Sequence, residues 1–569
     1  MYFKKLLEMK RIIFFLIILT FAACKKDFLN KGPLTNLSEE SYWKQGSDAE
    51  YAVNGLYEAF YEFDGGGEFL PGGAPYMDLC TDLMYLKAPW EFGFNDFNTG
   101  NLTADNGWVA SFWKKKYQYI RNCNFFFDNV DKVKDQLSPE SYNNLSGQAR
   151  VVRAFLYLRL VQGFGDVPLI TKTISADEWP ARTPAAEVME FVIAELAKAA
   201  EELPEEQSDG AHGRIYKYVA LAYKARAALH FAGFYNKPEY YEVAAEALAT
   251  IVNSGKFELF RKVEDPTDNF TQIFWAANEG ADNKEIIFSD QFIKDLRPSN
   301  ISTSFAGPGW KGQQAQQNYI DMFEDKAGWQ AHHISFKEMN SYRNTKILKS
   351  PLDGKSATYD PKNEFADRDP RLNATFFNPN IYVDANGVIQ KRGEDWAPAN
   401  RNFAPDWEND CYFFKKLVDP TNFNPVYYYG NSDNNFPLVR YSDMLLLYAE
   451  ALNEIGRTGE AATYVNLVRN RVDMPDIATG DQDEMREIIK HERKIELIAE
   501  QVLVWDYKRW REYERTMPGA AEFYGFRREA YGQSSILLQR KYITSKYYLW
   551  PIPAVELRNN QNMVQNIGW

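Results

Sequence analysis

Residues 440–455 read RYSDMLLLYAEALNEI, and this stretch decides the fold class. Its large apolar side chains recur every three or four residues, which is the spacing of one face of an α-helix. The residues of this stripe are Tyr441, Leu445, Tyr448, Leu452 and Ile455. The acidic residues Asp443, Glu450 and Glu454 lie off the stripe. The stretch therefore predicts a long amphipathic helix.

The same helical spacing recurs on both sides of this stretch. We expect helices over residues 111–133, 138–163, 214–233, 238–254, 460–471 and 484–511. A first helix is expected to begin at Ser47, which forms a capping box with Glu50. Ser138 and Pro139 mark another start, since proline loses no hydrogen bond at the first helical position. The protein is therefore predicted to be mostly α, with tetratricopeptide-like helix pairs but no strict 34-residue repeat.

Two long segments lack the helical spacing. Residues 64–110 are rich in Gly and Asn, and residues 257–437 show only short strand-like runs, such as 285–288 and 387–390. Long irregular segments are usually functional or disordered, and the many aromatic residues here argue against disorder. We expect a single body over residues 47–569. Its helical scaffold covers residues 47–256 and 438–569, and a variable ligand-binding half covers residues 257–437.

The N-terminus reads as a lipoprotein signal. Basic residues precede the apolar run 12–21, and Ala22, Ala23 and Cys24 follow it. This order is that of a secretory signal peptide, and the run is too short to span a bilayer. We expect cleavage after residue 23, lipidation of Cys24 and a tether over residues 24–46. Met9 is an alternative start to Met1.

Composition excludes several classes of function. The net charge of −13 argues against electrostatic binding of nucleic acid or of an anionic membrane surface. After Cys24 is lipidated, the chain keeps Cys80, Cys123 and Cys411, an odd number that predicts neither a disulfide framework nor a zinc site. No second apolar stretch is long enough to span a membrane.

No catalytic motif is present in the sequence. The chain contains no HExxH, GxSxG or phosphate-binding loop, and His332-His333 would need further ligands to hold a metal. Nothing in the local sequence distinguishes the paired carboxylates of a glycoside hydrolase from charged residues on the surface. Calcium is compatible with the many Asp and Asn residues, but the spacing of an EF-hand is absent, so no cofactor is predicted.

Aromatic content is the better functional signal. Aromatic residues make up 15% of the chain, with 14 Trp. Aromatic rings stack on the apolar faces of sugars while polar side chains bind the hydroxyls. The candidate sugar-binding residues, all in the two irregular segments, are Asp78, Asp82, Trp90, Trp310, Trp329 and Trp407. The competing interpretation is that these tryptophans belong to the core.

Several segments together resemble the SusD/RagB family of outer-membrane nutrient-binding lipoproteins. They are QARVVRAFLY at 148–157, GFGDVPL at 163–169, DPRL at 369–372, RYSDMLLLYAEALNE at 440–454 and WPIPAVE at 550–556. In the family's late helix, Gln501 and Leu503 stand where Gly and Arg are usual, and Gln561 and Ile567 stand where prolines are common. The resemblance runs from end to end of the chain.

The resemblance implies a binding protein and not an enzyme. Such proteins sit on the outer face of the outer membrane, act as the lid of a SusC-like TonB-dependent transporter and bind glycans, or in some members peptides. The hallmark segments are scaffold positions, and the ligand site draws on the loop after the first helix and on the middle insertion. A peptide-binding lid and a surface glycoside hydrolase are the alternatives.

Overall fold

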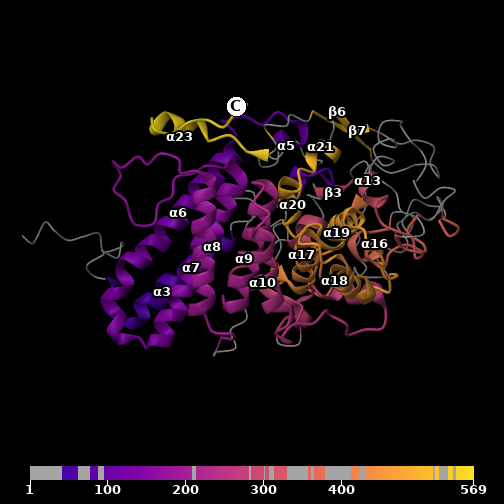
Figure 1. Ribbon diagram of the computed structural model, residues 1–569, viewed down its shortest axis with the longest axis horizontal. Coiled ribbons are helices and arrows are strands. Elements are labelled where there is room, and N and C mark those ends of the chain that lie inside the picture. Colours follow the sequence, from indigo (N-terminus) through magenta and orange to yellow (C-terminus); the bar gives the residue numbers. More distant parts are fainter. Residues whose placement is uncertain are drawn as a thin grey trace, which may run out of the picture.

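Long helices packed side by side form the frame of the molecule (Figure 1). The computed structural model describes residues 42–61, 77–86, 95–207, 213–280, 283–299, 301–306, 313–329, 356–359, 364–378, 412–422, 431–516, 520–524, 536–541, 546 and 548–569. The first part of the frame consists of α3 (Gly46–Leu56), α6 (Gly107–Asn129), α7 (Pro139–Phe164), α8 (Ala185–Glu202), α9 (Lys217–Phe234) and α10 (Tyr240–Val252). Each helix from α6 to α10 packs against the next one along the chain.

The stack continues into helices that lie much later in the sequence. Helix α10 packs against α17 (Tyr441–Glu454), and α17 packs against both α18 (Thr458–Arg471) and α19 (Gln482–Leu497). Figure 1 shows these later helices in orange beside the magenta α9 and α10. The prediction of a mostly α-helical fold built from helix pairs is confirmed.

The remaining helical elements are short. They are α4 (Glu58–Tyr61), η2 (Met77–Cys80), α5 (Asn95–Thr99), η3 (Val130–Gln136), α11 (Pro266–Gln272), η4 (Ala276–Asn278), α12 (Ile301–Ala306), α13 (Gln317–Ile320), α16 (Pro370–Thr375), α20 (Leu503–Arg509), α21 (Tyr513–Thr516) and α23 (Ala554–Asn559). Elements η2 and α5 lie within 64–110, and α11 to α16 lie within 257–437. Both segments therefore contain local structure that their sequence pattern does not reveal.

Of the two helix starts predicted from capping residues, one differs in the structure and one is confirmed. Helix α3 begins at Gly46, and the carboxylate of Asp48 accepts the backbone N–H of Lys44 and of Gln45, both at 2.9 Å. The predicted capping pair of Ser47 and Glu50 is therefore wrong, because Asp48 already binds the free amides at the start. Ser138 does cap α7, and its hydroxyl accepts the N–H of Ser141 at 3.1 Å.

The predicted single helix over 484–511 is broken. Helix α19 ends at Leu497 and α20 begins at Leu503. Between them Ala499 and Gln501 have φ values of 66° and 61°, which are left-handed conformations incompatible with a continuing helix. The sequence does not reveal this break, because neither Ala499 nor Gln501 is a glycine or a proline.

Short strands tie the middle segment to the scaffold. Strand β2 (Ile286–Asp290) pairs antiparallel with β5 (Phe436–Arg440), which leads directly into α17. Strand β1 (Met84–Leu86) pairs with β3 (Gln313–Ala315), and β3 pairs with β4 (Tyr412–Phe413). Strand β6 (Ala520–Tyr524) pairs with β7 (Ile536–Lys541). The strand expected at 285–288 is present, whereas 387–390 lies outside the described residues.

Charged residues of the hallmark segments are buried and paired. The carboxylate of Asp443 accepts hydrogen bonds from Arg226 at 2.6 Å and from Arg493 at 2.7 Å. Glu496 pairs with Arg371 at 3.1 Å, and with Arg440 and Arg471 at 2.6 Å each. Ion pairs of this kind join α17 and α19 to α9 and α16. The acidic residues off the stripe of α17 thus include interior ones, and Asp443 and Glu450 are both buried.

Among the described residues, no helix is long and apolar enough to cross a membrane. Cys80 and Cys123 are buried in the core. The predicted lipid anchor Cys24 lies outside the described residues, as does Cys411.

Candidate functional site

Two of the candidate sugar-binding residues, Asp78 and Asp82, lie in the interior. Their exposed fractions are 0% and 2%. The carboxylate of Asp78 accepts the backbone N–H of Ala499 at 3.0 Å, and that of Asp82 accepts the hydroxyl of Tyr507 at 2.5 Å. Asp78 therefore contacts the turn between α19 and α20, and Asp82 contacts α20. They support the scaffold and do not face solvent.

Burial also sets the acidity of Asp78. It raises the pKa of this carboxyl to about 7, although the nearby backbone N–H groups and Lys416 act in the opposite direction. A carboxyl that is half protonated near neutral pH, deep in the interior, fits a structural role at this turn.

The third described candidate, Trp329, is 6% exposed. Its ring lies 5.0 Å from that of His491 on α19, and His491 in turn lies 3.2 Å from Glu324. Trp329 therefore packs as a core side chain against α19. The other candidates, Trp90, Trp310 and Trp407, lie outside the described residues.

A cavity lined by described residues lies where the scaffold meets the middle segment. We call it the cleft; its volume is about 500 Å³, within the range of 300–1,000 Å³ that is usual for small-molecule sites. Its walls are formed by the loop between α8 and α9 (205–207 and 213–216), the loop after α10 (256–257), the segments 273–280 and 283–291, and residues 435 and 437. Pairing of β2 with β5 holds two of these walls together.

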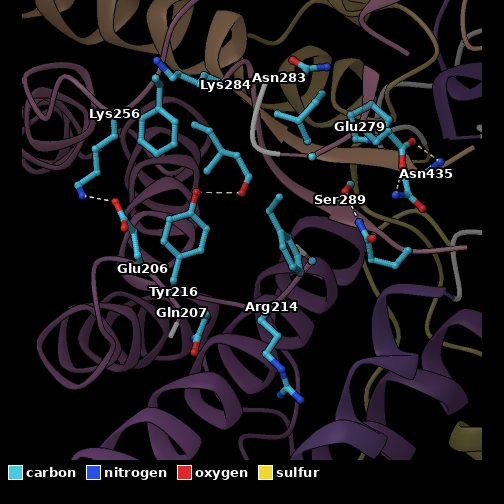
Figure 2. A pocket seen from close by; sticks show the side chains of 18 of the residues that line it. Glu206, Gln207, Arg214, Tyr216, Lys256, Glu279, Asn283, Lys284, Ser289 and Asn435 are labelled. Carbon is cyan, nitrogen blue, oxygen red and sulfur yellow. Dashed lines mark hydrogen bonds and ion pairs between the residues drawn. The ribbon is translucent and has the colours of Figure 1, made fainter. Parts of the chain in front are cut away.

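Half-buried aromatic rings and polar groups together line the cleft. Tyr216 and Phe257 are half-buried, and the hydroxyl of Tyr216 donates to the carbonyl of Ile287 at 3.1 Å. In Figure 2, Gln207 and Arg214 lie on one side of Tyr216, and Asn283 and Lys284 lie on the opposite side of the opening. The cleft thus presents ring surfaces together with amide, guanidinium and ammonium donors.

Glu279 is the group in the cleft wall with the most altered acidity. Its carboxylate accepts the backbone N–H of Asn435 at 2.7 Å. Burial raises the pKa of Glu279 to about 8, and the nearby Asp433 and Asp419 add to this shift. Glu279 is therefore mostly protonated at neutral pH and can donate a hydrogen bond.

A second, smaller hollow adjoins the cleft. Its volume is about 190 Å³, and it shares Gly213, Phe288, Ser289 and Gln291 with the cleft. Its far wall is formed by residues 54–60, at the end of the first helix pair, and by Arg297. The two hollows are therefore neighbours beside β2 and the loop before α9. No group of three His, Cys, Asp or Glu residues suited to a metal ion occurs among the described residues.

Comparison with known proteins places this architecture. The SusD family model matches residues 276–569, which is more than half of the chain. The chain belongs to the SusD family. A further family model, described as "Starch-binding associating with outer membrane", matches residues 80–229. The family resemblance of the hallmark segments is thereby confirmed.

Several SusD relatives are similar over almost their whole length. SusD-like protein P2 of Formosa agariphila is 28% identical, with 98% of each chain covered. The structure of a SusD-like carbohydrate binding protein of Bacteroides fragilis superposes with a TM-score of 0.74 at 23% identity, covering 92% of this chain and 99% of that one. Surface glycan-binding protein A of Bacteroides thetaiotaomicron, in complex with laminarihexaose, has a TM-score of 0.66 at 18% identity, covering 92% and 100%.

Sequence reasoning missed the residues of the cleft. Tyr216, Phe257 and Glu279 come from three separate segments, and none of them belongs to a local motif. The sequence offers one indication of these residues: Tyr216 and Phe257 lie near the ends of the helices expected over 214–233 and 238–254. Partial exposure, which distinguishes these rings from core aromatics, depends on the tertiary contacts.

Proposed function

We propose that this SusD-family protein captures an oligosaccharide at the cell surface and binds it in the cleft. The observation that carries the proposal is the cleft itself, where half-buried rings and hydrogen-bond donors share a cavity of about 500 Å³. A sugar ring offers apolar C–H faces and a rim of hydroxyls, and the rings of Tyr216 and Phe257 together with nearby donors suit both. The family description and the glycan-binding relatives support this ligand class.

Delivery to a transporter forms part of the same proposal. The protein passes its ligand to a SusC-like TonB-dependent transporter in the outer membrane and acts as the lid of that transporter. A lipid on Cys24 and the tether over residues 24–46 would keep the protein at the membrane surface. The association of the matched family with the outer membrane supports this location.

The protein binds its ligand without cleaving it. The carbohydrate-binding character of the family supports this part of the proposal. A peptide-binding lid is the alternative of the same type, and a surface glycoside hydrolase is the alternative from the class of enzymes. The sugar-stacking role of Trp90, Trp310 and Trp407 stays a prediction.

Affinity electrophoresis of the full chain through gels containing single polysaccharides tests this function. We expect at least one polysaccharide to retard the wild-type protein, and its oligosaccharides to be recovered intact after incubation with the protein. Retardation by no polysaccharide, combined with saturable binding of peptides, would favour the peptide-binding lid. Release of shorter sugars would identify a hydrolase.

A pair of matched variants tests the role of the cleft. Tyr216→Ala removes a half-buried ring from the cleft, and we expect it to weaken binding of the retained glycan by about 10-fold, since stacking contributes on the order of 1–2 kcal/mol. Tyr51→Ala removes an exposed ring of α3 that does not line the cleft, so its binding should equal that of the wild type. Equal affinities of all three proteins would refute the assignment of the ligand to the cleft.

A further inference from the structure

Arg159 is a buried cation without a carboxylate partner among the described residues. It lies on α7 and is 5% exposed. One of its terminal nitrogens donates to the side-chain carbonyl of Gln162 at 2.8 Å, and its Nε has no hydrogen-bond partner. Its guanidinium carbon lies 4.8 Å from the ring of Trp505. A buried, unpaired charge is costly, and arginine rarely escapes this cost by losing its proton.

A small internal cavity lies beside Arg159. Its volume is about 20 Å³, enough for one water-sized sphere, which needs about 10–15 Å³ by the same measure. The residues that line it come from five helices, α7, α9, α17, α19 and α20, and from the turn before α20: Arg159, Gln162, Arg226, Leu229, Leu447, Arg493, Val502, Trp505, Asp506 and Arg509. The cavity therefore has room for one small species.

The charges around the cavity do not cancel. Arg226 pairs with Asp443, Arg493 with Asp443 and Asp506, and Arg509 with Asp506 and Glu450. Four guanidinium groups, including that of Arg159, therefore meet three carboxylates, and one positive charge remains without a counter-charge.

Two further groups near the cavity show the same positive environment. Lys508 is buried, and its ammonium group donates to the backbone carbonyl of Gln162 at 2.9 Å. Burial lowers the pKa of His230 well below its ordinary value, and Lys508, Arg509 and Arg159 lower it further. Burial likewise lowers the pKa of Arg159 to about 9, and Arg226 lowers it further, whereas Tyr223 and Asp506 act in the opposite direction.

We propose that this cavity is a binding site for a single halide ion, chloride under ordinary conditions. A monatomic anion fits the volume, carries the missing charge and accepts hydrogen bonds from the donor-only guanidinium of Arg159. Water would fit equally well but would leave the positive charge uncompensated. The ion would link the early helices α7 and α9 to the late helices α17, α19 and α20, and it would thereby stabilise the scaffold away from the glycan cleft.

Thermal unfolding of the full chain at constant ionic strength tests the site. We expect Tm to rise saturably, by about 1–3 °C, when sodium gluconate is replaced by sodium chloride, because a ligand of the folded state stabilises it. Arg159→Met removes the unpaired cation while keeping a long side chain, and we expect it to abolish the response. Arg457→Met removes an exposed arginine paired with Glu460 on the surface and should retain the response.

Crystals of the wild-type protein soaked in sodium bromide provide a measurement that does not depend on the variant's folding. We expect an anomalous peak in the cavity beside Arg159. Density there without an anomalous signal would show a water molecule and refute the site. Equal Tm values in chloride and gluconate, or a chloride response that survives in Arg159→Met, would also overturn the proposal.

Discussion

Glu496 shows how single residues hold this scaffold together. Its carboxylate meets three arginines, Arg371, Arg440 and Arg471, in an interior from which water is excluded. Burial alone would raise the pKa of Glu496, but the three arginines outweigh it and hold the pKa below its ordinary range. Partners arranged in this way make the removal of one member costly, since the others are left buried and unpaired.

Glu496→Gln should therefore destabilise the protein strongly. Loss of one partner from a buried ion pair costs about 3–5 kcal/mol, and here three arginines lose charge compensation. Denaturant unfolding measures the change, and Glu460→Gln, in an exposed pair with Arg457, is the control with little expected effect. A similar loss in both variants would contradict the role of the buried network.

The lowered pKa of Glu496 also predicts acid sensitivity. Stability from a carboxylate with a depressed pKa is present above its unfolded pKa of about 4.5 and is lost as the pH falls below that value. The wild-type protein should lose stability over this acidic range, and Glu496→Gln should lose less. Parallel pH profiles of the two proteins would show that other groups cause the loss.

Glu279 predicts a pH dependence of the opposite sign. Its pKa is raised from 4.5 to about 8, so the folded protein keeps a proton that the unfolded chain releases. This carboxyl should therefore lower stability progressively as the pH rises from about 4.5 to 8. Glu279→Gln imitates the protonated form, and the difference in Tm between variant and wild type should grow over this range. A constant difference would refute the assignment.

At the residue scale, the sequence predicts chemistry better than exposure. Asp78, Asp82 and Trp329 have the residue types of a sugar site and lie in irregular segments, but the structure buries all three. Exposure depends on which late helix folds over a loop, and α19 and α20 are more than 400 residues distant from Asp78 along the chain. A local pattern contains no information about such contacts.

At the scale of elements, the turn between α19 and α20 departs most from its predicted structure. Gln501 has a φ of 61°, a conformation that glycine adopts without strain, and both polar atoms of its buried side-chain amide lack hydrogen-bond partners in the structure. Glycine is the usual residue at this place in the resembling family. The structure therefore gives a physical reason for the preference for glycine. The sequence alone shows only that Gln501 differs from the usual residue.

Gln501→Gly should accordingly stabilise the protein by about 1 kcal/mol, because it relieves a left-handed conformation and removes an unpaired amide. Ala462→Gly, in the regular part of α18, should destabilise it by about the same amount. Denaturant unfolding compares the two. If both variants are destabilised, the packing of the Gln501 side chain outweighs the strain at this turn.

Helices were predictable wherever their apolar spacing was regular. Helices α7, α9, α10, α17 and α18 lie within a few residues of their predicted bounds. The short strands and helices of the middle segment were not, because β2 and β5 form by pairing across about 150 residues. Elements stabilised by distant partners have no local period long enough to read.

At the scale of the whole molecule, the fold places a groove between two parts that are distant in sequence. The loop before α9 supplies Tyr216, and the middle segment supplies Phe257, Glu279 and residues of β2. Membership of the SusD family was predictable from the hallmark segments. Their charged residues form buried ion pairs that join distant elements of the scaffold. The cleft was not predictable, because it exists only where those parts meet.

Hydrogen exchange followed by mass spectrometry, with and without the oligosaccharide that the protein retains, tests the central claim most directly. Binding in the cleft should slow exchange in residues 205–207, 213–216, 273–280 and 283–291, with little change in α23, none of whose residues lines the cleft. Slowed exchange confined to other segments, such as 87–94 and 307–312, would contradict the assignment of the glycan to the cleft.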